Sequence, residues 1–590
     1  MWKIFRFMRK RDRGYALLCL LLVAGQVWVD LTMPDYMSDI TRLIVTPGSA
    51  MGDIWIAGGK MLLCALGSAA LSVIVGFFAA RLASNFSFTI REKVFHQVTD
   101  FGAEEIKRFS TASLITRTTN DITQIQMLVA MGLQVMIKAP IMAVWAVLKI
   151  VGKNWQLSLV TAAAVVIIML VILTLMRLVL PKFRIVQQQI DDVNRVTREN
   201  LTGLRIVRAF NAEAYQKEKF ETVNQNLMAT QLYTSRHLAV LMPVISMVMS
   251  GLSLAIYWLG ASLVNGISVT GPAAILQRVE MFSEVVVFSS YAMYVIMSFM
   301  MMIMIFMMLP RAQVSAARIE EVLSSSPRVS EGGGVQGTEK GHLSFRHVFF
   351  RYADAAEDCL QDISFEAHPG ETVAFIGATG SGKSTLVSLA ARLFDATEGE
   401  VMLDGKDIRD YTFAQLYSKV GFISQKAVLF SGTVEENLTF GDASHPIAKE
   451  DWSTALDIAQ AKGFVENLPG KSGATIAQGG TNLSGGQKQR LAIARAIARK
   501  PEILIFDDSF SALDYQTDAA LRRRLATDMK GTTCLIVAQR IGTIKHADRI
   551  VVLDEGRVVG IGTHEELLEH CGVYREIAAS QFSQAELEGV

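Results

Sequence analysis

The fold of the second half of this chain is decided by the stretch Gly377-Ala-Thr-Gly-Ser-Gly-Lys-Ser384, which directly follows the apolar run 372–376. Its glycines let successive backbone N–H groups curl around the oxygens of a phosphate group. Lys383 can then neutralise the outer phosphates, and Ser384 can offer its hydroxyl to Mg²⁺. A strand, this loop and a helix in succession predict a site for a nucleoside phosphate. The residues that we expect to surround the phosphates are Gly377, Thr379, Gly380, Ser381, Gly382, Lys383, Ser384 and Thr385.

Two further motifs follow downstream. The first is Leu483-Ser-Gly-Gly-Gln487, which stands directly before a basic, alanine-rich segment with helical spacing. Glycines at a helix start expose backbone N–H donors at the positive end of the helix dipole, which favours an anion. The second is the apolar run 503–506, which ends in two acids, Asp507 and Asp508. From about residue 342, short β-rich runs alternate with helices, and this alternation predicts a mostly parallel sheet.

The first half of the chain is dominated by apolar segments. In the whole sequence 51% of residues are hydrophobic and 19% are charged, against ~25% charged residues in an average soluble domain. A bilayer core of ~30 Å requires about 20 apolar residues in a helix. The first apolar run is too long for a cleaved secretory signal, so we expect it to be retained as a membrane helix. The six expected membrane helices are 15–37, 54–80, 125–151, 157–180, 238–264 and 282–309.

The connections between these segments differ in length and charge. Those at 81–124 and 181–237 are long, polar and rich in Lys and Arg, whereas the others are short and carry few basic residues. Because basic residues gather on the cytoplasmic side, we expect the long connections, the N-terminus and the second half of the chain to be cytoplasmic. The helical spacing of the long connections predicts hairpins that reach well beyond the membrane.

These patterns give a fold class and a division of the chain. We expect an α-helical transmembrane domain of six helices with long cytoplasmic extensions, followed by an α/β phosphate-loop ATPase domain. The stretch 331–341 contains five glycines and predicts a flexible linker. The expected boundaries are 1–325 for the transmembrane domain, 326–341 for the linker, 342–578 for the nucleotide-binding domain and 579–590 for a C-terminal tail.

Charge and cysteine content exclude other classes. The net charge is +1, and no basic stripe of the kind that nucleic-acid binders carry is present. We therefore expect no nucleic-acid partner. The five cysteines are scattered without the spacing of a metal site, which favours reduced thiols.

With these motifs in place, residues 342–578 resemble the nucleotide-binding domain of ATP-binding-cassette (ABC) transporters, and residues 1–325 resemble the exporter-type membrane domain. The resemblance covers almost the whole chain, and it implies ATP and Mg²⁺ as ligands. It further implies that Tyr352 stacks on adenine, that Gln425 contacts Mg²⁺ and the attacking water, and that Asp507 holds Mg²⁺.

The resemblance also implies a dimer. In this family two nucleotide-binding domains sandwich two ATPs, each between the phosphate loop of one domain and the signature motif of the other. The loop 511–514 is the family's crossing to the other domain. The signature motif is intact in this chain, and its residues expected to contact ATP held by a partner are Ser484, Gly485, Gly486 and Gln487.

Two positions depart from the family pattern at the site of hydrolysis. Members that hydrolyse efficiently have Glu where this chain has Asp508, and His where it has Gln539. A general base needs reach as well as a suitable pKa, and Asp is one methylene shorter than Glu. We therefore interpret Asp508 and Gln539, together with Gln425, as the catalytic positions of a degenerate site that holds ATP rather than splitting it. The simplest architecture is a heterodimer whose other subunit supplies Glu and His. A third departure, Gln478-Gly479 in place of Glu-Arg, affects the usual charged contact with the membrane domain.

The membrane half offers weaker signals about the substrate. The segment 293–308 contains eight methionines, whose side chains adapt to ligands of varied shape, although lipid-facing or core packing explains a single methionine equally well. Asp30, Lys138 and Glu284 lie within apolar segments, where ionisable groups tend to be functional. Their roles stay open, because positions close to the outer interface would be solvated.

These observations lead to one expected function and two alternatives. We expect a subunit of a heterodimeric, ATP-driven exporter that moves hydrophobic or amphipathic compounds (drugs, lipids or peptide-like molecules) out across the cytoplasmic membrane. One alternative is a metal–siderophore importer of the same architecture, which a cavity rich in basic residues would favour. The other is a channel or regulatory subunit, but such proteins usually carry long insertions and none is present. The six apolar segments exclude a soluble ABC protein that acts on nucleic acid.

Overall fold

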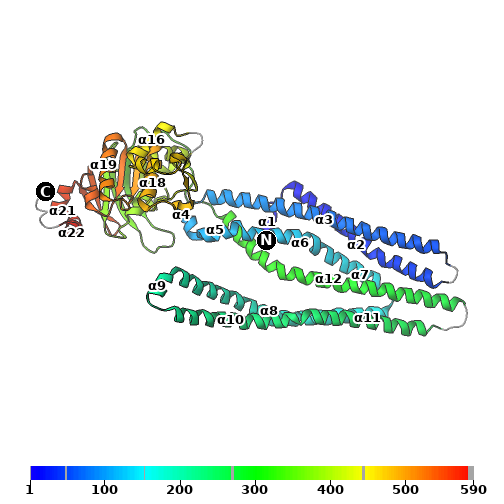
Figure 1. The fold of residues 1–590 in the computed structure, drawn as a ribbon. Helices are drawn as coiled ribbons and strands as arrows, with labels where there is room; N and C mark the ends of the chain where they lie inside the picture. The colour runs from blue at the N-terminus through cyan, green and yellow to red at the C-terminus, as the bar shows by residue number, and fades with distance from the viewer. Residues whose placement is uncertain (1, 47–48, 152, 268–271, 442–445, 583–590) are drawn as a thin grey trace. The chain divides into compact units, whose positions relative to one another are not determined.

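The computed structural model describes residues 2–46, 49–151, 153–267, 272–441 and 446–582. The chain divides into two compact units. The helical unit consists of residues 1–98 and 112–325, and the α/β unit consists of residues 99–111 and 326–590 (Figure 1). Part of the expected C-terminal tail, residues 583–590, lies outside the described residues.

The first unit is helical, with several long helices and a few short ones. They are α1 (Trp2–Phe5), α2 (Lys10–Val45), α3 (Met51–Thr99), α5 (Thr111–Thr118), α6 (Asn120–Met131), a π-helical turn (Gly132–Met136), α7 (Ile137–Val151), α8 (Trp155–Thr202), α9 (Leu204–Ala209), α10 (Glu213–Ala239), α11 (Leu241–Asn265) and α12 (Pro272–Ser324).

Among the described residues, six stretches of this unit are long and apolar enough to cross a membrane. They are Lys10–Val45, Met51–Thr99, Thr111–Val151, Trp155–Thr202, Glu213–Asn265 and Ala274–Met302. The predicted six membrane helices with long extensions are therefore confirmed. Helix α3, for example, has 49 residues and spans about 73 Å at 1.5 Å per residue, far more than the ~30 Å of a bilayer core. A helix suits this environment because it satisfies its backbone polar groups internally.

Helix α12 forms the centre of the helical unit. It packs against α2, α7 and α11, and Phe288, Tyr291 and Ile296 on it are almost fully buried. The second long connection is an extended hairpin, in which α8 and α10 run side by side and α9 forms the tip (Figure 1).

The α/β unit contains two main sheets. One is six-stranded with the order β12-β11-β3-β10-β9-β6, and the other is four-stranded with the order β2-β1-β4-β5. All neighbours in the first sheet are parallel except β11 and β12, as the alternation of short runs and helices predicted. The strands are β1 (Leu343–Phe350), β2 (Leu360–Ala367), β3 (Thr372–Gly377), β4 (Glu398–Leu403), β5 (Lys406–Asp407), β6 (Val420–Ile423), β9 (Ile503–Asp507), β10 (Thr533–Val537), β11 (Arg549–Asp554) and β12 (Arg557–Gly562), with a small pair β7 (Gly432–Thr433) and β8 (Thr475–Ile476).

Helices cover the parallel sheet on both faces. Along β3, Val373 and Phe375 point into one hydrophobic core and Ala374 and Ile376 into another, because successive side chains of a strand alternate between faces. The helices of the α/β unit are α4 (Ala103–Phe109), α13 (Lys383–Ala390), α14 (Phe413–Lys419), α15 (Val434–Leu438), α16 (Lys449–Ile458), α17 (Lys462–Glu466), α18 (Gly485–Ala498), α19 (Tyr515–Asp528), α20 (Ile541–Ile544), α21 (His564–His570) and α22 (Gly572–Gln581).

The glycine-rich stretch before β1 is held against the α/β unit by backbone hydrogen bonds. The N–H of Gly332 donates to Tyr411 O at 3.1 Å, and the N–H of Gly334 donates to Asp410 O at 2.9 Å. A Cβ atom on Gly332 would lie 2.4 Å from the carbonyl oxygen of Arg409. Glycine is needed at this position for a close approach of two backbones, and not only for the flexibility that the sequence suggested.

Candidate nucleotide-binding site

The phosphate loop connects the end of β3 to the start of α13. Gly382 precedes the helix with φ of +94°, a backbone conformation that favours glycine. A Cβ on Gly377 would lie 2.0 Å from the carbonyl oxygen of Leu553 on β11. The parallel register of β3, β10 and β9 brings this loop to the same sheet edge as the acids that follow β9. The fold therefore places the loop and these acids at one edge.

Lys383 is the first residue of α13, directly after the loop. Its ammonium group donates to Gly377 O at 2.9 Å and to Ala378 O at 2.7 Å, and Ser381 Oγ lies 3.2 Å away. Burial lowers the pKa of Lys383, while the charges of Asp508 and Asp507 oppose this shift. The buried positive charge lies where it can neutralise the outer phosphates of a nucleotide.

Ser384 and Asp507 form a pair of oxygen ligands that suits Mg²⁺. The hydroxyl of Ser384 donates to Asp507 Oδ1 at 2.7 Å, although the two residues are 123 positions apart. Burial raises the pKa of Asp507, helped by the nearby charge of Asp508, whereas the hydrogen bond from Ser384 and the charge of Lys383 act in the opposite direction. A carboxylate and a hydroxyl are hard ligands of the kind that Mg²⁺ takes together with phosphate oxygens. Both residues would therefore hold the ion.

Asp508 is engaged by both of the other residues that we assigned to hydrolysis. Its Oδ2 accepts from Gln425 Nε2 at 3.0 Å and from Gln539 Nε2 at 2.7 Å. The three residues follow three different strands, β6, β9 and β10, so the parallel sheet brings them together. Asp508 has φ of +47°, a left-handed conformation that Asp tolerates better than most residues. The fold thus orients a short carboxylate toward two amides.

Tyr352 lies close to the phosphate loop. Its hydroxyl is 3.0 Å from Thr385 Oγ1, and the rings of Phe350 and Phe394 pack edge-on against it. Lys107, from α4 in the first long connection, holds its ammonium 5.0 Å from the centre of the Tyr352 ring. The sequence did not indicate this contact of Lys107 with Tyr352. No local pattern links a residue in that connection to an aromatic residue 245 positions later.

The signature motif begins helix α18. Ser484 is its N-cap: its Oγ accepts from the N–H of Gln487 at 3.3 Å, and Gln487 Oε1 accepts from the N–H of Ser484 at 2.9 Å. Ser484 and Gly485 are exposed, and a Cβ on Gly485 would have no neighbour within 4 Å. Gly486 is more enclosed, because its Cβ would lie 3.3 Å from Ala512 O. The start of this helix is an open, positively polarised surface.

In the helical unit, Asp30 and Lys138 form an ion pair. Their charged atoms lie 2.9 Å apart, Asp30 is 7% exposed, and the hydroxyl of Ser68 donates to the same carboxylate. Lys138 follows the π-helical turn by two residues. A second pair, Asp35 with Lys149 at 2.7 Å, also accepts a hydrogen bond from Tyr291. The sequence indicated Asp30 and Lys138 separately but not that they pair.

Other expectations for the membrane half are less defined. Glu284 is half-buried on α12. Of the methionines in 293–308, Met293 and Met297 are exposed in this chain. The side chains of Met304 and Met307 lie outside the described residues.

Comparison with known proteins places both units. A family described as "ABC transporter transmembrane region" matches residues 16–299, and a family described as "ABC transporter" matches residues 360–511. The chain belongs to the ABC transporter family. An uncharacterized ABC transporter ATP-binding protein of Mycobacterium tuberculosis is 37% identical, over 100% of both chains.

Two further comparisons extend to a flippase and to a solved structure. The ATP-dependent lipid A-core flippase of Hahella chejuensis is 31% identical, over 87% of this chain and 85% of that protein. A solved structure of a bacterial Atm1-family ABC exporter with ATP bound matches with a TM-score of 0.76 at 22% identity, covering 98% of this chain and 100% of that one. This ABC transporter subunit therefore has the exporter-type fold, with a multi-pass membrane domain fused to an ATP-binding domain.

Proposed function

We propose that this chain is one subunit of a heterodimeric exporter, driven by ATP, that moves hydrophobic or amphipathic compounds out across the cytoplasmic membrane. The observation that carries the heterodimer is the geometry of Asp508. Its carboxylate accepts hydrogen bonds from Gln425 and Gln539. Efficient members of the family carry Glu where this chain has Asp508 and His where it has Gln539.

The geometry supports a site that binds ATP and turns it over slowly. A general base must come within hydrogen-bond reach of the water that it deprotonates. The Asp508 side chain is one methylene short of Glu, and both amides are bonded to a single oxygen of it. Gln539 is neutral at every pH, so it can donate a hydrogen bond to a phosphate but supplies no positive charge to it. Lys383, Ser384 and Asp507 keep the arrangement needed to bind the nucleotide and Mg²⁺.

The intact signature motif supports a partner with a complete site. Ser484 and Gly485 are exposed and open, and the dipole of α18 favours negative charge at this end. We propose that they bind the terminal phosphate of ATP held in the phosphate loop of the partner.

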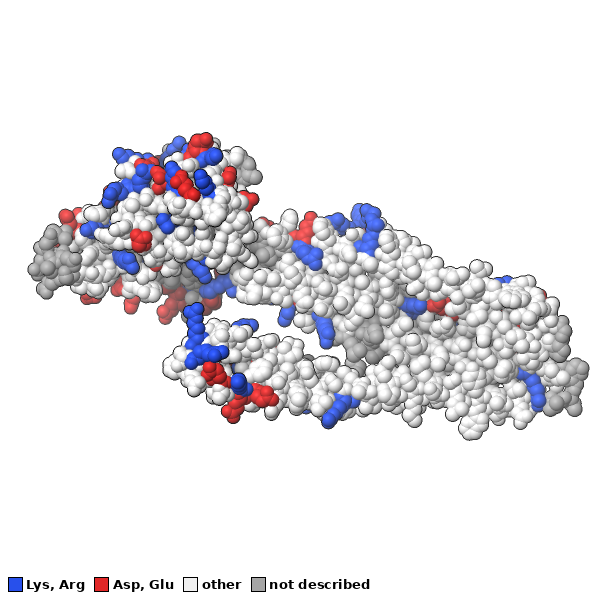
Figure 2. Space-filling view, in the orientation of Figure 1, with Lys and Arg blue, Asp and Glu red and all other residues white. Residues whose placement is uncertain are grey.

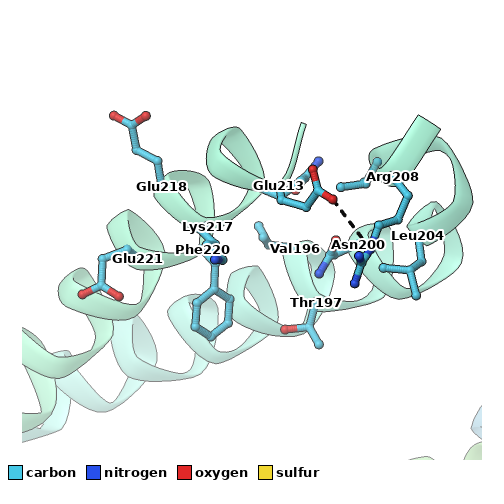
Figure 3. A pocket seen from close by; sticks show the side chains of 12 residues that line it. Val196, Thr197, Asn200, Leu204, Arg208, Glu213, Lys217, Glu218, Phe220 and Glu221 are labelled. Carbon is cyan, nitrogen blue, oxygen red and sulfur yellow. Dashed lines mark ion pairs between the residues drawn. The ribbon is translucent and has the colours of Figure 1, made fainter. Parts of the chain in front are cut away.

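The tip of the second long connection supplies a docking surface for that partner. Phe210, Leu201 and Ile206 on or beside α9 are 79%, 68% and 65% exposed. A cavity of about 740 Å³ lies between α8, α9 and α10, and Arg208 pairs with Glu213 in its lining (Figure 3). By contrast, α4 of the first connection belongs to this chain's own α/β unit, where Phe109 is buried. Because an exposed apolar patch marks an interaction site, we propose that α9 docks onto the ATPase domain of the other subunit.

The proposed substrate class rests on the membrane half. Figure 2 shows few charged side chains along most of the long helices, whereas charges crowd over the α/β unit. A related flippase is named for a lipid, and the methionine-rich part of α12 suits ligands of varied shape. The Lys- and Arg-rich long connections support a cytoplasmic position for the ATPase domain. Amphipathic molecules taken from the membrane or cytoplasm fit these features.

One experiment tests the weak site directly. The lone chain, reconstituted in lipid vesicles, should hydrolyse ATP slowly, and the double variant Asp508→Glu, Gln539→His should hydrolyse it at least ~100-fold faster, since a catalytic base contributes about 10²–10⁴-fold. Adding Lys383→Ala to the double variant should remove the gain. Turnover of the unmodified lone chain equal to that of the two-subunit complex would refute the heterodimer. Uptake of a metal–siderophore complex into the compartment that contains the ATPase domains would refute the outward direction.

A further inference from the structure

Two histidines and a glutamate meet at the end of the β1–β2 pair. In this antiparallel pair, Ser344 lies opposite Glu366, so the same register places His342 opposite His368. Side chains two residues apart on a strand share a face. His342, Glu366 and His368 therefore project from one face of the sheet.

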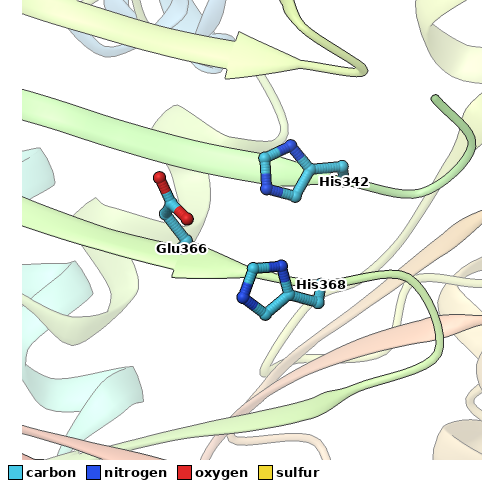
Figure 4. A group of neighbouring side chains, drawn as sticks. All are labelled: His342, Glu366 and His368. Atoms are coloured by element: carbon cyan, nitrogen blue, oxygen red, sulfur yellow. The ribbon is translucent and has the colours of Figure 1, made fainter. Parts of the chain in front are cut away.

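The distances between these three side chains suit a metal ion. Their ligand atoms all lie within 4.8 Å of one another, and the two imidazole rings are nearly parallel with centres 5.5 Å apart (Figure 4). A tetrahedral ion with bonds of ~2.0–2.1 Å holds its ligand atoms about 3.4 Å apart. Glu366 and His368 are exposed, so small rotations of their side chains can close the remaining gap.

Two neighbouring side chains support the cluster. Glu339 Oε2 lies 3.0 Å from His342 Nδ1, and metal-binding histidines characteristically give their second nitrogen to a carboxylate in this way. This contact leaves Nε2 of His342 for a metal. Ser344, on the same face, is buried, and its hydroxyl has no hydrogen-bond partner within the described residues. A metal-bound water can supply one.

We propose that His342, Glu366 and His368 bind Zn²⁺ or a similar divalent transition metal. Two imidazole nitrogens select such an ion over Mg²⁺ and Ca²⁺, which prefer oxygen ligands. Three protein ligands leave a fourth position open to water. The site is separate from the nucleotide site, because His368 precedes β3 and the phosphate loop follows it. The six residues of β3 alone span about 20 Å.

The position of the site indicates what the metal does. Thr533 Oγ1 donates to Gly341 O at 2.6 Å and lies 3.3 Å from His368 O, so it joins the end of the linker to the turn before β3. A metal that bridges His342 and His368 strengthens the same junction. Since it binds the folded unit and not the unfolded chain, it raises stability by RT ln(1 + c/Kd), where c is the concentration of free metal.

The test uses the full chain in detergent, without a polyhistidine tag and after treatment with a chelator. Co²⁺ is titrated while its visible absorption is followed, and Zn²⁺ is then added in competition. We expect one equivalent of Co²⁺, bound in a low-coordinate site and displaced by Zn²⁺, together with a higher unfolding temperature in Zn²⁺. His342→Ala and His368→Ala should each weaken binding at least ~10-fold, and Glu339→Gln by about 10–100-fold.

A matched control lies on the same strand. His347 is 80% exposed and sits 2.7 Å from Asp362, so His347→Ala removes an imidazole beside a carboxylate outside the cluster and should leave binding unchanged. Glu366→Gln alters an exposed side chain, so its metal affinity can still be measured if a histidine variant fails to fold. Equal affinity in the parent chain and the Glu366→Gln or His368→Ala variant would overturn the proposal, as would an equal loss in His347→Ala.

Discussion

Gly485→Asp separates the role of the signature motif from the role of this chain's own site. In the isolated chain the substitution is well tolerated, because Gly485 has no positive φ and a Cβ there meets nothing within 4 Å. An aspartate in the first turn of α18 even interacts favourably with the helix dipole, by about 0.3–1 kcal/mol. Within the proposed dimer, however, the new carboxylate faces the terminal phosphate of the partner's ATP.

The size of the loss follows from the repulsion between the two charges. Two unit charges ~4 Å apart interact with about 4 kcal/mol at an effective dielectric constant of ~20, and each ~1.4 kcal/mol is a factor of ten. We therefore expect the ATPase rate of the reconstituted two-subunit complex to fall by about 10³-fold. Asp508→Ala should lower the same rate only severalfold, because it alters the site that we propose to be slow.

A control for a new surface charge is available in the same unit. Gly463 in α17 is exposed and its Cβ would also have no neighbour within 4 Å, so Gly463→Asp should leave turnover unchanged. The assay compares ATPase and transport of the three variants in one vesicle preparation, with the unfolding temperature of each. If Gly485→Asp proves milder than Asp508→Ala, the assignment of the signature motif to the partner's ATP is wrong.

Three other perturbations test individual contacts. Asp30→Asn should destabilise the helical unit by about 3–5 kcal/mol, because it leaves the Lys138 charge without its partner. The double variant Asp30→Asn, Lys138→Gln should recover much of this loss. Thermal unfolding of both variants in detergent shows whether the double variant is the more stable. Burial lowers the pKa of His564, helped by the charges of Lys545 and His546 and opposed by Glu565. Because this pKa is lower in the folded chain than in the unfolded chain, the unfolded chain binds more protons below pH ~6.5. The free energy of unfolding should therefore fall as the pH drops from about 7 to about 5. The unfolding temperature of His564→Gln should change less over that pH range, and an identical slope would contradict this origin. Gly332→Ala should destabilise the α/β unit by about 1–3 kcal/mol through overpacking, since its Cβ would lie 2.4 Å from Arg409 O. Gly333→Ala should be neutral, because its Cβ would have no neighbour within 4 Å. Equal unfolding temperatures of the two variants would count against the close approach at Gly332.

The sequence predicted those features that local patterns encode. The pairing of Ser384 with Asp507 follows from two motifs that each come directly after a parallel strand, and parallel strands bring such residues to one edge of the sheet. The six membrane helices follow from the length of apolar segments. In both cases a rule of strand or helix geometry is enough to place the residues.

Features that depend on packing between distant segments could not be predicted in the same way. Lys107 reaches the Tyr352 ring, and Asp30 reaches Lys138, only because separate elements pack together, and no periodicity records which side chains will face each other. The glycine at 332 looked like a source of flexibility, since composition cannot distinguish a free segment from one pressed against a backbone. The His342–His368 pair was equally hidden, because it required the register of β1 against β2.

The exposed tip formed by α9 has a consequence for how the cell must make this subunit. In the proposed heterodimer, Phe210 and Ile206 present an exposed apolar surface until the partner covers α9, and chaperones and proteases recognise such surfaces. On this proposal, a subunit synthesised in excess of its partner would be removed, so production of the two chains would have to be balanced. If the proposed heterodimer forms, matched synthesis, most simply from adjacent genes on one messenger RNA, follows from the exposure of a single turn of helix.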